Sequence, residues 1–378
     1  MGKDGQLIAA SILLAFFITT CLAGSAIPQG NSQEITLQEM GQIDTPGFAR
    51  DVVIREVGST ILAYVADMGT AFGSTYGGLL IYNVSNPQHP KAMGSFYDGG
   101  RSHHIFFIED DVALVTDNTG GLEIFNVSDP WNPDKISQFN ANYINDLAVQ
   151  GTIVFVTDFL DGVIALDVSN LTNPVEIGLF SIEHVQPIKI IGNLAYVSGS
   201  NNLILLNIMD PTNITEVARY DLQVSRIQTT GNTAYMACSG SWLEPADGFK
   251  IMNITDPLNL EEIGSYHDGG HPIDLQVSGN TAFVSDGDEG IEVLDISNPS
   301  SIKEIAGYYD GGNATGIQVV GDLIFVADGP DGLEILRIIV NEGTTSPTAP
   351  GFGLFFATTA LALVTIKWKT RGKRLENH

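Results

Sequence analysis

The 378-residue sequence has little cysteine and little positive charge. Its two cysteines, Cys21 and Cys238, are too few for a disulfide-stapled scaffold, and a chain of this length can bury a sizeable core without one. Lys and Arg number 17 against 44 Asp and Glu, and between residues 27 and 350 the count is 11 against 42. Such an acidic surface repels phosphate groups, so we exclude nucleic acid as a partner.

The sequence also lacks the short motifs of nucleophilic and metal-dependent catalysis. It has no Gly-x-Ser-x-Gly elbow, no His-Glu-x-x-His and no phosphate-binding glycine loop ahead of a helix. Between the termini no segment has the length and pattern of an ordinary helix. Enzymatic activity therefore has no direct support, although carboxylates that shift one another's pKa need no such motif.

What the sequence does contain is one unit repeated seven times. An apolar run followed by a small residue and Asn-Pro or Asp-Pro recurs, with anchor residues at Asn83, Asn126, Asp167, Asn207, Asn253, Asp295 and Arg337. A spacing of 40 to 46 residues is typical of a propeller or solenoid. Each unit has four short runs rich in Val, Ile, Tyr and Phe, bounded by Gly, Asn, Asp and Pro, which predict antiparallel strands.

The seventh unit lacks its fourth run, and a segment near the N-terminus resembles it. Gln38–Asp44 compares with Glu261–Asp268 of the fifth unit. We therefore predict an all-β, seven-bladed propeller of four-stranded antiparallel blades over residues 35–340. In this prediction Ile35–Thr45 pairs beside Leu333–Ile338 and closes the ring. An open β-solenoid is the alternative, and it would not need complementary chain ends.

The unit resembles the LVIVD repeat, in which AYVAD-like, GL-x-I-like and DVSNP-like segments follow one another. The matching segments are Ala63–Asp67 (AYVAD), Gly120–Pro130 (GGLEIFNVSDP), Phe283–Pro299 (FVSDGDEGIEVLDISNP) and Phe325–Leu336 (FVADGPDGLEIL). The resemblance covers about Gly47–Ile338. It implies a propeller found on or outside cells, and it implies no shared reaction.

The N-terminal segment has the features of a secretory signal peptide. Residues 1–26 combine the basic Lys3, the apolar run Leu7–Leu22 and small residues suited to cleavage. We expect this hydrophobic segment to be helical, and an uncleaved membrane anchor is the alternative.

The C-terminal segment has the features of a membrane anchor. Residues 341–350 form a polar stalk, residues 351–368 an apolar transmembrane helix, and residues 369–378 a basic cytoplasmic tail. Thr348–Val364 also resembles an archaeal PGF-type sorting signal, which implies replacement of the tail by a lipid. We expect the protein in the cell membrane, single-pass or lipid-tethered, with the propeller outside.

Six Asn-x-Ser/Thr sequons occur. Those at Asn83, Asn126 and Asn253 belong to the repeat itself, so we expect their side chains to cap the strand end. The loop sequons are the candidate glycosylation sites, Asn170, Asn213 and Asn313.

In a four-stranded blade, the loops between strands two and three emerge on the same face as the connections from strand four to the next blade. We call this face the mouth, and we place the candidate binding residues there: Asp98, Arg101, His103, His104, Asp117, Asp158, Asp268, His271, Asp286, Asp310 and Asp328. No cofactor is required, but the oxygen-rich loop with Asp286, Asp288 and Glu289 is a candidate Ca²⁺ site. A turn-fixing role for its first Asp is the alternative. The histidines are candidate ligands for a transition metal.

We expect a binding, adhesion or surface-assembly module that recognises an extracellular protein or glycan. The alternatives are a metal-dependent hydrolase or lyase acting on surface glycans, and a structural spacer. An enzyme requires three or more mouth groups that converge in a deep pocket. A recognition module requires dispersed carboxylates on a shallow rim, and a spacer has no distinct pocket on either face.

Overall fold

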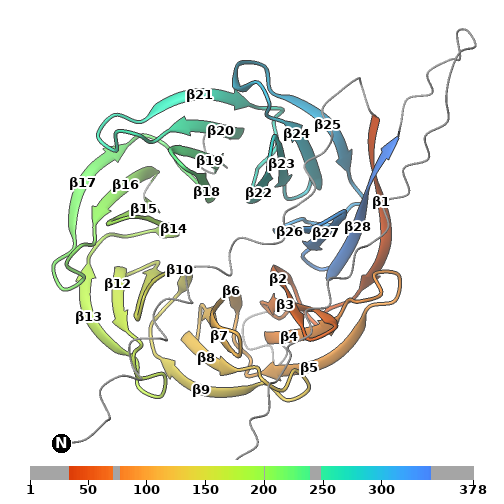
Figure 1. Cartoon of the computed structure of the whole chain (residues 1–378). Helices are drawn as coiled ribbons and strands as arrows, with labels where there is room; N and C mark the ends of the chain where they lie inside the picture. The colour runs from red at the N-terminus through yellow and green to blue at the C-terminus, as the bar shows by residue number, and fades with distance from the viewer. Residues whose placement is uncertain (1–33, 71–76, 200, 239–247, 342–378) are drawn as a thin grey trace, which may run out of the picture. The chain divides into compact units, whose positions relative to one another are not determined.

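The computed structural model describes residues 34–70, 77–199, 201–238 and 248–341. These residues form 28 strands and one three-residue 3-10 helix, η1 (Pro299–Ser301). The strands make seven four-stranded antiparallel sheets set around a central axis (Figure 1). The predicted all-β, seven-bladed propeller is therefore confirmed. All described residues belong to one compact unit.

The first three blades follow the chain from the innermost strand outward. Blade 1 comprises β2 (Ala49–Val57), β3 (Thr60–Asp67), β4 (Gly78–Asn83) and β5 (Lys91–Tyr97). Blade 2 comprises β6 (Ser102–Glu109), β7 (Val112–Asp117), β8 (Gly121–Asn126) and β9 (Asp134–Phe139). Blade 3 comprises β10 (Ile144–Gln150), β11 (Ile153–Asp158), β12 (Gly162–Asp167) and β13 (Val175–Phe180).

Blades 4 to 6 repeat this order. Blade 4 comprises β14 (Val185–Ile191), β15 (Leu194–Gly199), β16 (Asn202–Asn207) and β17 (Thr215–Tyr220). Blade 5 comprises β18 (Arg226–Thr230), β19 (Thr233–Cys238), β20 (Gly248–Asn253) and β21 (Glu261–Tyr266). Blade 6 comprises β22 (Asp274–Ser278), β23 (Thr281–Ser285), β24 (Ile291–Asp295) and β25 (Lys303–Tyr308).

Blade 7 joins the two ends of the described chain. It comprises β26 (Gly316–Val320), β27 (Leu323–Ala327), β28 (Leu333–Asn341) and, as its outer strand, β1 (Glu34–Ile43). The β1–β28 ladder runs from Glu34 opposite Asn341 to Ile43 opposite Leu333. The predicted closure of the ring is therefore confirmed, and β1 covers an edge of β28 that would otherwise lie open.

The joint between blades 7 and 1 uses the same contact as other joints. A glycine in the fourth strand of one blade faces the carbonyl oxygen of the proline corner in the next blade. A Cβ placed on the glycine would lie 1.9–2.4 Å from that oxygen in the pairs Gly94–Pro130, Gly178–Pro211, Gly264–Pro299 and Gly41–Pro87. Because Gly41 lies in β1, the N-terminal strand makes the contact of a regular fourth strand.

The hydrophobic core lies between blades. One cluster combines Phe155 and Val163 of blade 3 with Val197 and Leu206 of blade 4. Each blade thus buries its apolar faces against its neighbours, which is why the fold needs the complete repeat array.

The strand-end asparagines have the structural role expected of them. The Oδ1 atoms of Asn83, Asn126 and Asn253 accept hydrogen bonds of 3.0–3.1 Å from the backbone N–H two residues further on. These bonds fix the chain as it turns toward the proline corner.

The predicted signal peptide (1–26), the hydrophobic segment at 351–368 and the basic tail at 369–378 lie outside the described residues, as does all of the stalk except its first residue. Within the described part of the chain, no helix has both the length and the apolarity to cross a bilayer.

Candidate functional site

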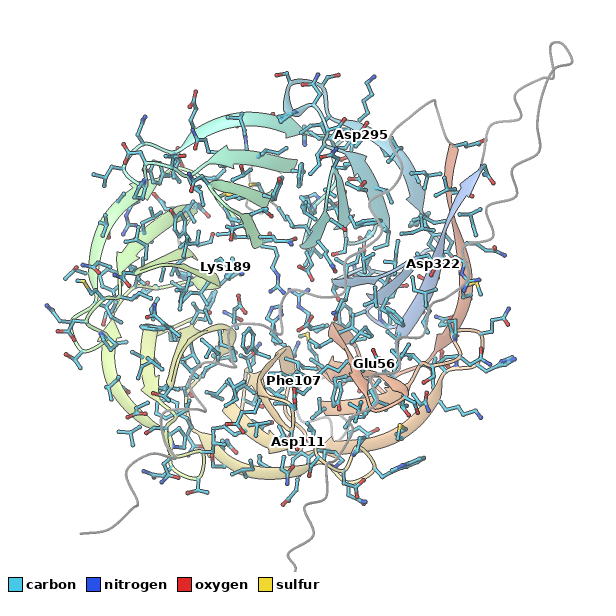
Figure 2. All side chains as sticks on the ribbon, in the orientation of Figure 1. Glu56, Phe107, Asp111, Lys189, Asp295 and Asp322 are labelled. Atoms are coloured by element: carbon cyan, nitrogen blue, oxygen red, sulfur yellow. The ribbon has the colours of Figure 1, made fainter. Side chains whose placement is uncertain are left out.

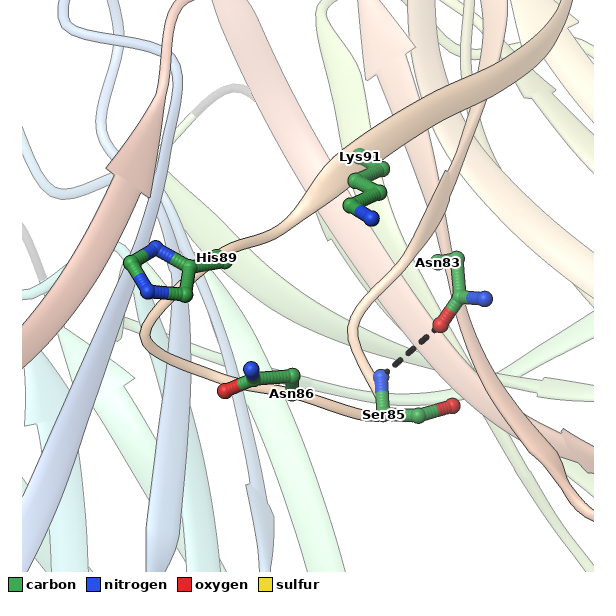
Figure 3. Close-up of a pocket in the computed structure, with 5 residues that line it drawn as sticks. All are labelled: Asn83, Ser85, Asn86, His89 and Lys91. Atoms are coloured by element: carbon green, nitrogen blue, oxygen red, sulfur yellow. Dashed lines mark hydrogen bonds between the residues drawn. The ribbon is translucent and has the colours of Figure 1, made fainter.

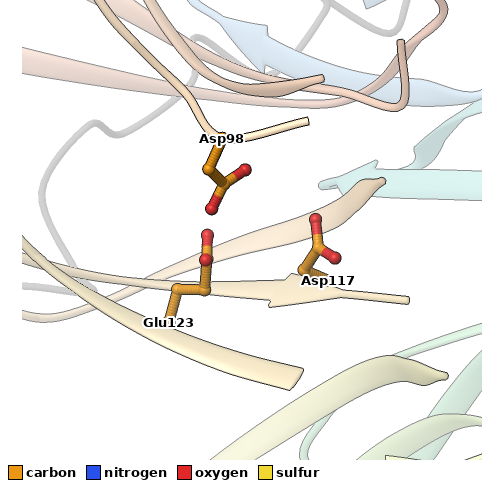
Figure 4. Close-up of side chains that lie close together, drawn as sticks. All are labelled: Asp98, Asp117 and Glu123. Carbon is orange, nitrogen blue, oxygen red and sulfur yellow. The ribbon is translucent and has the colours of Figure 1, made fainter. Parts of the chain in front are cut away.

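The structure brings part of the predicted mouth residues together in three carboxylate clusters. In each cluster, carboxylate oxygens of three residues lie within 4.8 Å of one another. The blade 2 cluster is Asp98, Asp117 and Glu123 (Figure 4), the blade 6 cluster is Asp268, Asp286 and Glu289, and the blade 7 cluster is Asp310, Asp328 and Glu334. Glu292, which interacts with Asp268 and Asp286, extends the blade 6 cluster.

Each cluster has the same construction, which joins two blades. The first Asp follows the fourth strand of the preceding blade and accepts a 3.0 Å hydrogen bond from the glycine N–H two residues on. The second Asp ends or follows the second strand of its blade. A glutamate lies in the third strand of the same blade: Glu123, Glu292 or Glu334. The Asp-Gly-Gly turn covers the second Asp so closely that a Cβ on Gly100, Gly270 or Gly312 would lie 1.8–2.1 Å from its Oδ2.

The clusters differ in how their second Asp is bonded. Asp117 Oδ1 accepts hydrogen bonds from the N–H groups of Thr119 (2.7 Å) and Gly120 (2.6 Å), which fixes the loop. Among the described residues, neither carboxylate oxygen of Asp286 makes a hydrogen bond of ordinary length and angle, although the backbone N–H of His271 is close enough to lower its pKa, and Asp328 Oδ2 makes none. The turn-fixing interpretation therefore applies to Asp117 but not to Asp286.

Burial and mutual repulsion raise the pKa values of the buried acids. Burial, with the nearby Asp268 and Glu289 charges, raises the pKa of Asp286 to about 7. Burial and a hydrogen bond with Asp268 raise the pKa of Glu292 to about 9. In blade 7, burial and the Asp310 charge raise the pKa of Asp328 to about 6 and that of Glu334 to about 8. Without a cation, Glu292 and Glu334 therefore hold their protons at neutral pH, and Asp286 is partly protonated there.

The remaining predicted mouth residues do not join these clusters. Asp158 accepts hydrogen bonds from the N–H groups of Leu160 (2.8 Å) and Asp161 (3.0 Å) in its own loop. Arg101 and His271 lie in the connections before β6 and β22. Asp288 contacts the Asn313 side chain. Of the three candidate glycosylation sites, Asn313 is half-buried, whereas Asn170 and Asn213 are exposed.

His103 and His104 lie in β6, an innermost strand, and not in a mouth loop as the sequence analysis placed them. The Asn118 amide contacts His103 Nε2 at 2.8 Å, and His104 Nδ1 lies 3.5 Å from Asp51 Oδ2. Burial and nearby Arg50 lower the pKa of His103, so it is neutral at pH 7. Among the described residues, no cluster of three potential metal ligands includes a histidine.

Sequence reasoning missed a set of charged residues on the inner strands. Asp51, Asp146 and Asp274 each accept a hydrogen bond from the N–H of the following residue and one from the first strand of the next blade. Arg226 Nε lies 2.8 Å from Asp274 Oδ1, and Lys189 lies on the inner side of the ring (Figure 2). The sequence did carry a signal for these residues, because a charged residue occurs at the same place in several otherwise apolar first strands.

The mouth also carries an aromatic patch on blades 3 and 4, formed by Tyr143, Phe159, Leu160 and His184. Tyr143 and Leu160 are 40 % and 53 % exposed. The Phe159 and His184 rings meet edge to face with centroids 4.6 Å apart. Tyr143 and His184 have φ angles of 59° and 60°, a region that such residues seldom adopt and that often marks functional sites.

The opposite face has a pocket of about 400 Å³ at the β4–β5 corner of blade 1, lined by Asn83, Ser85, Asn86, His89 and Lys91 (Figure 3). This pocket and the carboxylate clusters lie at opposite ends of the blades, because the β4–β5 corner and the mouth loops are at opposite ends of β4.

Comparison with known families identifies the repeat. The family profile described as LVIVD repeat matches residues 46–98, 142–181, 183–222, 269–310 and 311–352, together more than half of the chain. The chain belongs to the LVIVD-repeat family. Blades 2 and 5 fall between the matched LVIVD segments, yet each has the same four strands.

Solved structures match this LVIVD-repeat protein at the level of the fold. The computationally designed Ika8 protein, in a crystal structure, is 12 % identical with a TM-score of 0.54, over 80 % of this chain and 100 % of the designed one. In all, 1217 chains match, so the fold is too widely shared to indicate a function. Comparison with curated proteins gives no match.

Proposed function

We propose that this LVIVD-repeat propeller is a binding or surface-assembly module, held at the cell membrane, that recognises a protein or glycan through its mouth without catalysing a reaction. One observation carries the proposal: the central Asp of each carboxylate cluster is buried, so that only outer acids such as Asp98, Asp268 and Asp310 are exposed, and the other exposed mouth groups are spread around the rim. Exposed aromatic side chains such as Tyr143 are typical anchors of binding surfaces.

The burial of the clusters argues against the hydrolase or lyase alternative. Three carboxylates do converge in each cluster, as an enzyme would require. However, Asp117 and Glu123 are 0 % and 1 % exposed, and Asp286 and Asp328 are equally hidden. A glycan cannot contact groups that the Asp-Gly-Gly turns cover. The spacer alternative is disfavoured by the aromatic patch and by the pocket on the opposite face.

The recognition role is tested with paired surface variants of the full chain. Tyr143→Ser/Leu160→Ser removes two exposed side chains of the aromatic patch. The control, Met209→Ser/Leu258→Ser, removes two residues that are 66 % and 65 % exposed at corners of the opposite face. Binding to isolated cell envelopes is measured by co-sedimentation. We expect at least a tenfold loss for the first variant only.

Equal binding by both variants would contradict recognition through the mouth. Treating the envelopes beforehand with protease or with periodate distinguishes a protein partner from a glycan partner. Release of reducing ends from envelope glycans by the wild-type chain, and not by Asp117→Asn, would support the enzyme instead.

The membrane attachment is tested separately. The proposal rests on the basic start and apolar run of residues 1–26 and on the apolar run and basic tail of residues 351–378. Protease added to intact cells should degrade the propeller, and a chain ending at Glu342 should appear in the medium. Retention of that shortened chain inside cells would contradict the proposed topology.

A further inference from the structure

One pair of positions repeats in every blade, and in four blades both of its members are charged. The first position lies in the third strand, opposite Val115, Met236, Val284 and Val326 in blades 2, 5, 6 and 7, where it is Glu123, Lys250, Glu292 and Glu334. The second position lies in the fourth strand and faces the third-strand residue that comes two residues after the first position. In the same four blades it is occupied by Lys135, Glu262, Glu304 and Glu39. The four pairs are therefore structurally equivalent.

Two of these pairs carry opposite charges. In blade 2, Lys135 Nζ lies 2.8 Å from Glu123 Oε1 and 3.1 Å from Asp98 Oδ2, inside the carboxylate cluster. In blade 5 the order is reversed, and Lys250 Nζ lies 2.9 Å from Glu262 Oε2. A lysine therefore places a positive charge beside the acids in both blades, which are the two that the LVIVD profile does not match.

The other two pairs carry two acids. Blade 6 has Glu292 with Glu304, and blade 7 has Glu334 with Glu39. Each pair adds to a cluster that already holds two aspartates. No Lys or Arg among the described residues forms a salt bridge with a member of these clusters, whereas blade 2 has Lys135.

The buried aspartates give a second, independent indication of a missing positive partner. Asp286 is 1 % exposed and neither of its oxygens makes a hydrogen bond of ordinary length and angle; Asp328 is 2 % exposed and its Oδ2 makes none. Buried carboxylates are normally paired, bonded or bound to a cation. Asp117, the equivalent in the lysine-containing cluster, accepts several hydrogen bonds.

We propose that the blade 6 and blade 7 clusters each bind one Ca²⁺ ion, and that the ammonium group of Lys135 takes the place of this ion in blade 2. The ligands are the carboxylates of Asp268, Asp286 and Glu289 in blade 6, with Glu292 beside them, and of Asp310, Asp328 and Glu334 in blade 7. Oxygen ligands 2.3–2.6 Å from one Ca²⁺ lie at most about 5 Å apart. The 4.8 Å limit within the clusters agrees with this geometry. Each ion would tie two neighbouring blades together.

This inference does not rest on the proposed recognition role, because Ca²⁺ binding is measured without a partner. The full chain, treated first with EDTA, is dialysed at pH 7.5 and constant ionic strength against Ca²⁺ up to about 10 mM, above the range in which extracellular modules bind. The bound metal is counted, and melting curves are recorded at each concentration. We expect two ions per chain and a melting temperature that rises with free Ca²⁺.

Lysine exchange variants make the test specific. Glu304→Lys copies the blade 2 arrangement into blade 6 and should leave one ion per chain. Lys135→Glu copies the blade 6 arrangement into blade 2 and should give three. Asp286→Asn/Asp328→Asn should bind none and, in EDTA, should melt no lower than the wild type, because it relieves repulsion between buried acids.

A control corrects for loose binding to the acidic surface. Asp134→Asn/Glu176→Gln removes the same two charges at exposed fourth-strand positions and should keep both ions. The proposal is overturned if the folded wild type binds no Ca²⁺, or if Glu304→Lys and Asp286→Asn/Asp328→Asn retain as many ions as this control.

Discussion

The buried glutamate of blade 2 should make the protein less stable as the pH rises. Glu123 is 1 % exposed. Burial and a hydrogen bond with Asp98 raise its pKa from 4.5 to about 8, although Lys135 opposes the shift. A group whose pKa is higher in the folded state binds its proton more tightly there. Its stabilising contribution is therefore complete below about pH 4.5 and lost as the pH rises through about 8.

The magnitude follows from the shift. Each unit of pKa corresponds to about 1.4 kcal/mol, so the free energy of unfolding should fall by up to about 5 kcal/mol over this range. The two neighbours do not interfere. The pKa of Asp98 is lowered, so its contribution is lost only below pH 3.8, and the pKa of Lys135 is raised, so its contribution is lost only above pH 10.5.

Urea unfolding at pH 5, 7 and 9 in EDTA, comparing wild type with Glu123→Gln, measures the effect. Gln keeps the shape and the hydrogen-bonding capacity of a protonated glutamate but does not titrate. We expect similar stability at pH 5 and a variant that is more stable than the wild type by several kcal/mol at pH 9. Glu176→Gln, at an exposed fourth-strand position, is the control. The reasoning would be refuted if the difference in free energy of unfolding between wild type and Glu123→Gln stayed constant with pH. It would also be refuted if the wild type were the more stable of the two at pH 9.

Three further predictions concern the ring and its inner strands. Gly178→Ala should lower the free energy of unfolding in urea by about 1–3 kcal/mol, because the new methyl group would lie 1.9 Å from a backbone carbonyl oxygen of blade 4. The control, Gly307→Ala, should cost less, because its closest contact is the movable end of a glutamate side chain. Deleting residues 34–43 leaves β28 as an open edge, so the chain should associate in size-exclusion chromatography; a monodisperse monomer would contradict this. Arg226→Met leaves buried Asp274 without its ion pair and should lower the free energy of unfolding by about 3–5 kcal/mol, with a loss under about 1 kcal/mol counting against it.

The fold could be predicted from the sequence because its determinants are local. Turn residues such as Gly151, with a φ of 65°, and the recurring proline corner mark the strand boundaries in most units. The closure could be predicted because β1 carries Gly41 where other fourth strands carry the glycine that faces the proline corner. These features depend on neighbours along the chain, so one sequence is enough to recognise them.

The site was predicted less well because it depends on contacts between blades. His103 and His104 follow the Gly-Gly turn so closely that the sequence does not show where the connection ends and β6 begins. The inner-strand charges Arg50, Lys189 and Arg226 come from three different blades. Only the ring geometry brings Arg50 near Asp274, Arg226 near Asp51, and Lys189 near Asp146.

The fourth-strand partners of the buried glutamates depend on register. A bulge shifts the pairing between Ile124 and Phe125 in blade 2, and the same irregularity occurs between Val293 and Leu294 in blade 6. Counting residues from the repeat anchor aligns Lys135 with its blade 6 equivalent, Glu304, but it does not show which third-strand residue either one faces. Once the ladders are known, the seven blades become a natural series of variants on one backbone. At the paired positions, two blades carry a lysine and two others carry a second glutamate, and this difference alters the charge beside the buried acids. Because many unrelated proteins share the fold, function is to be sought in such differences between blades.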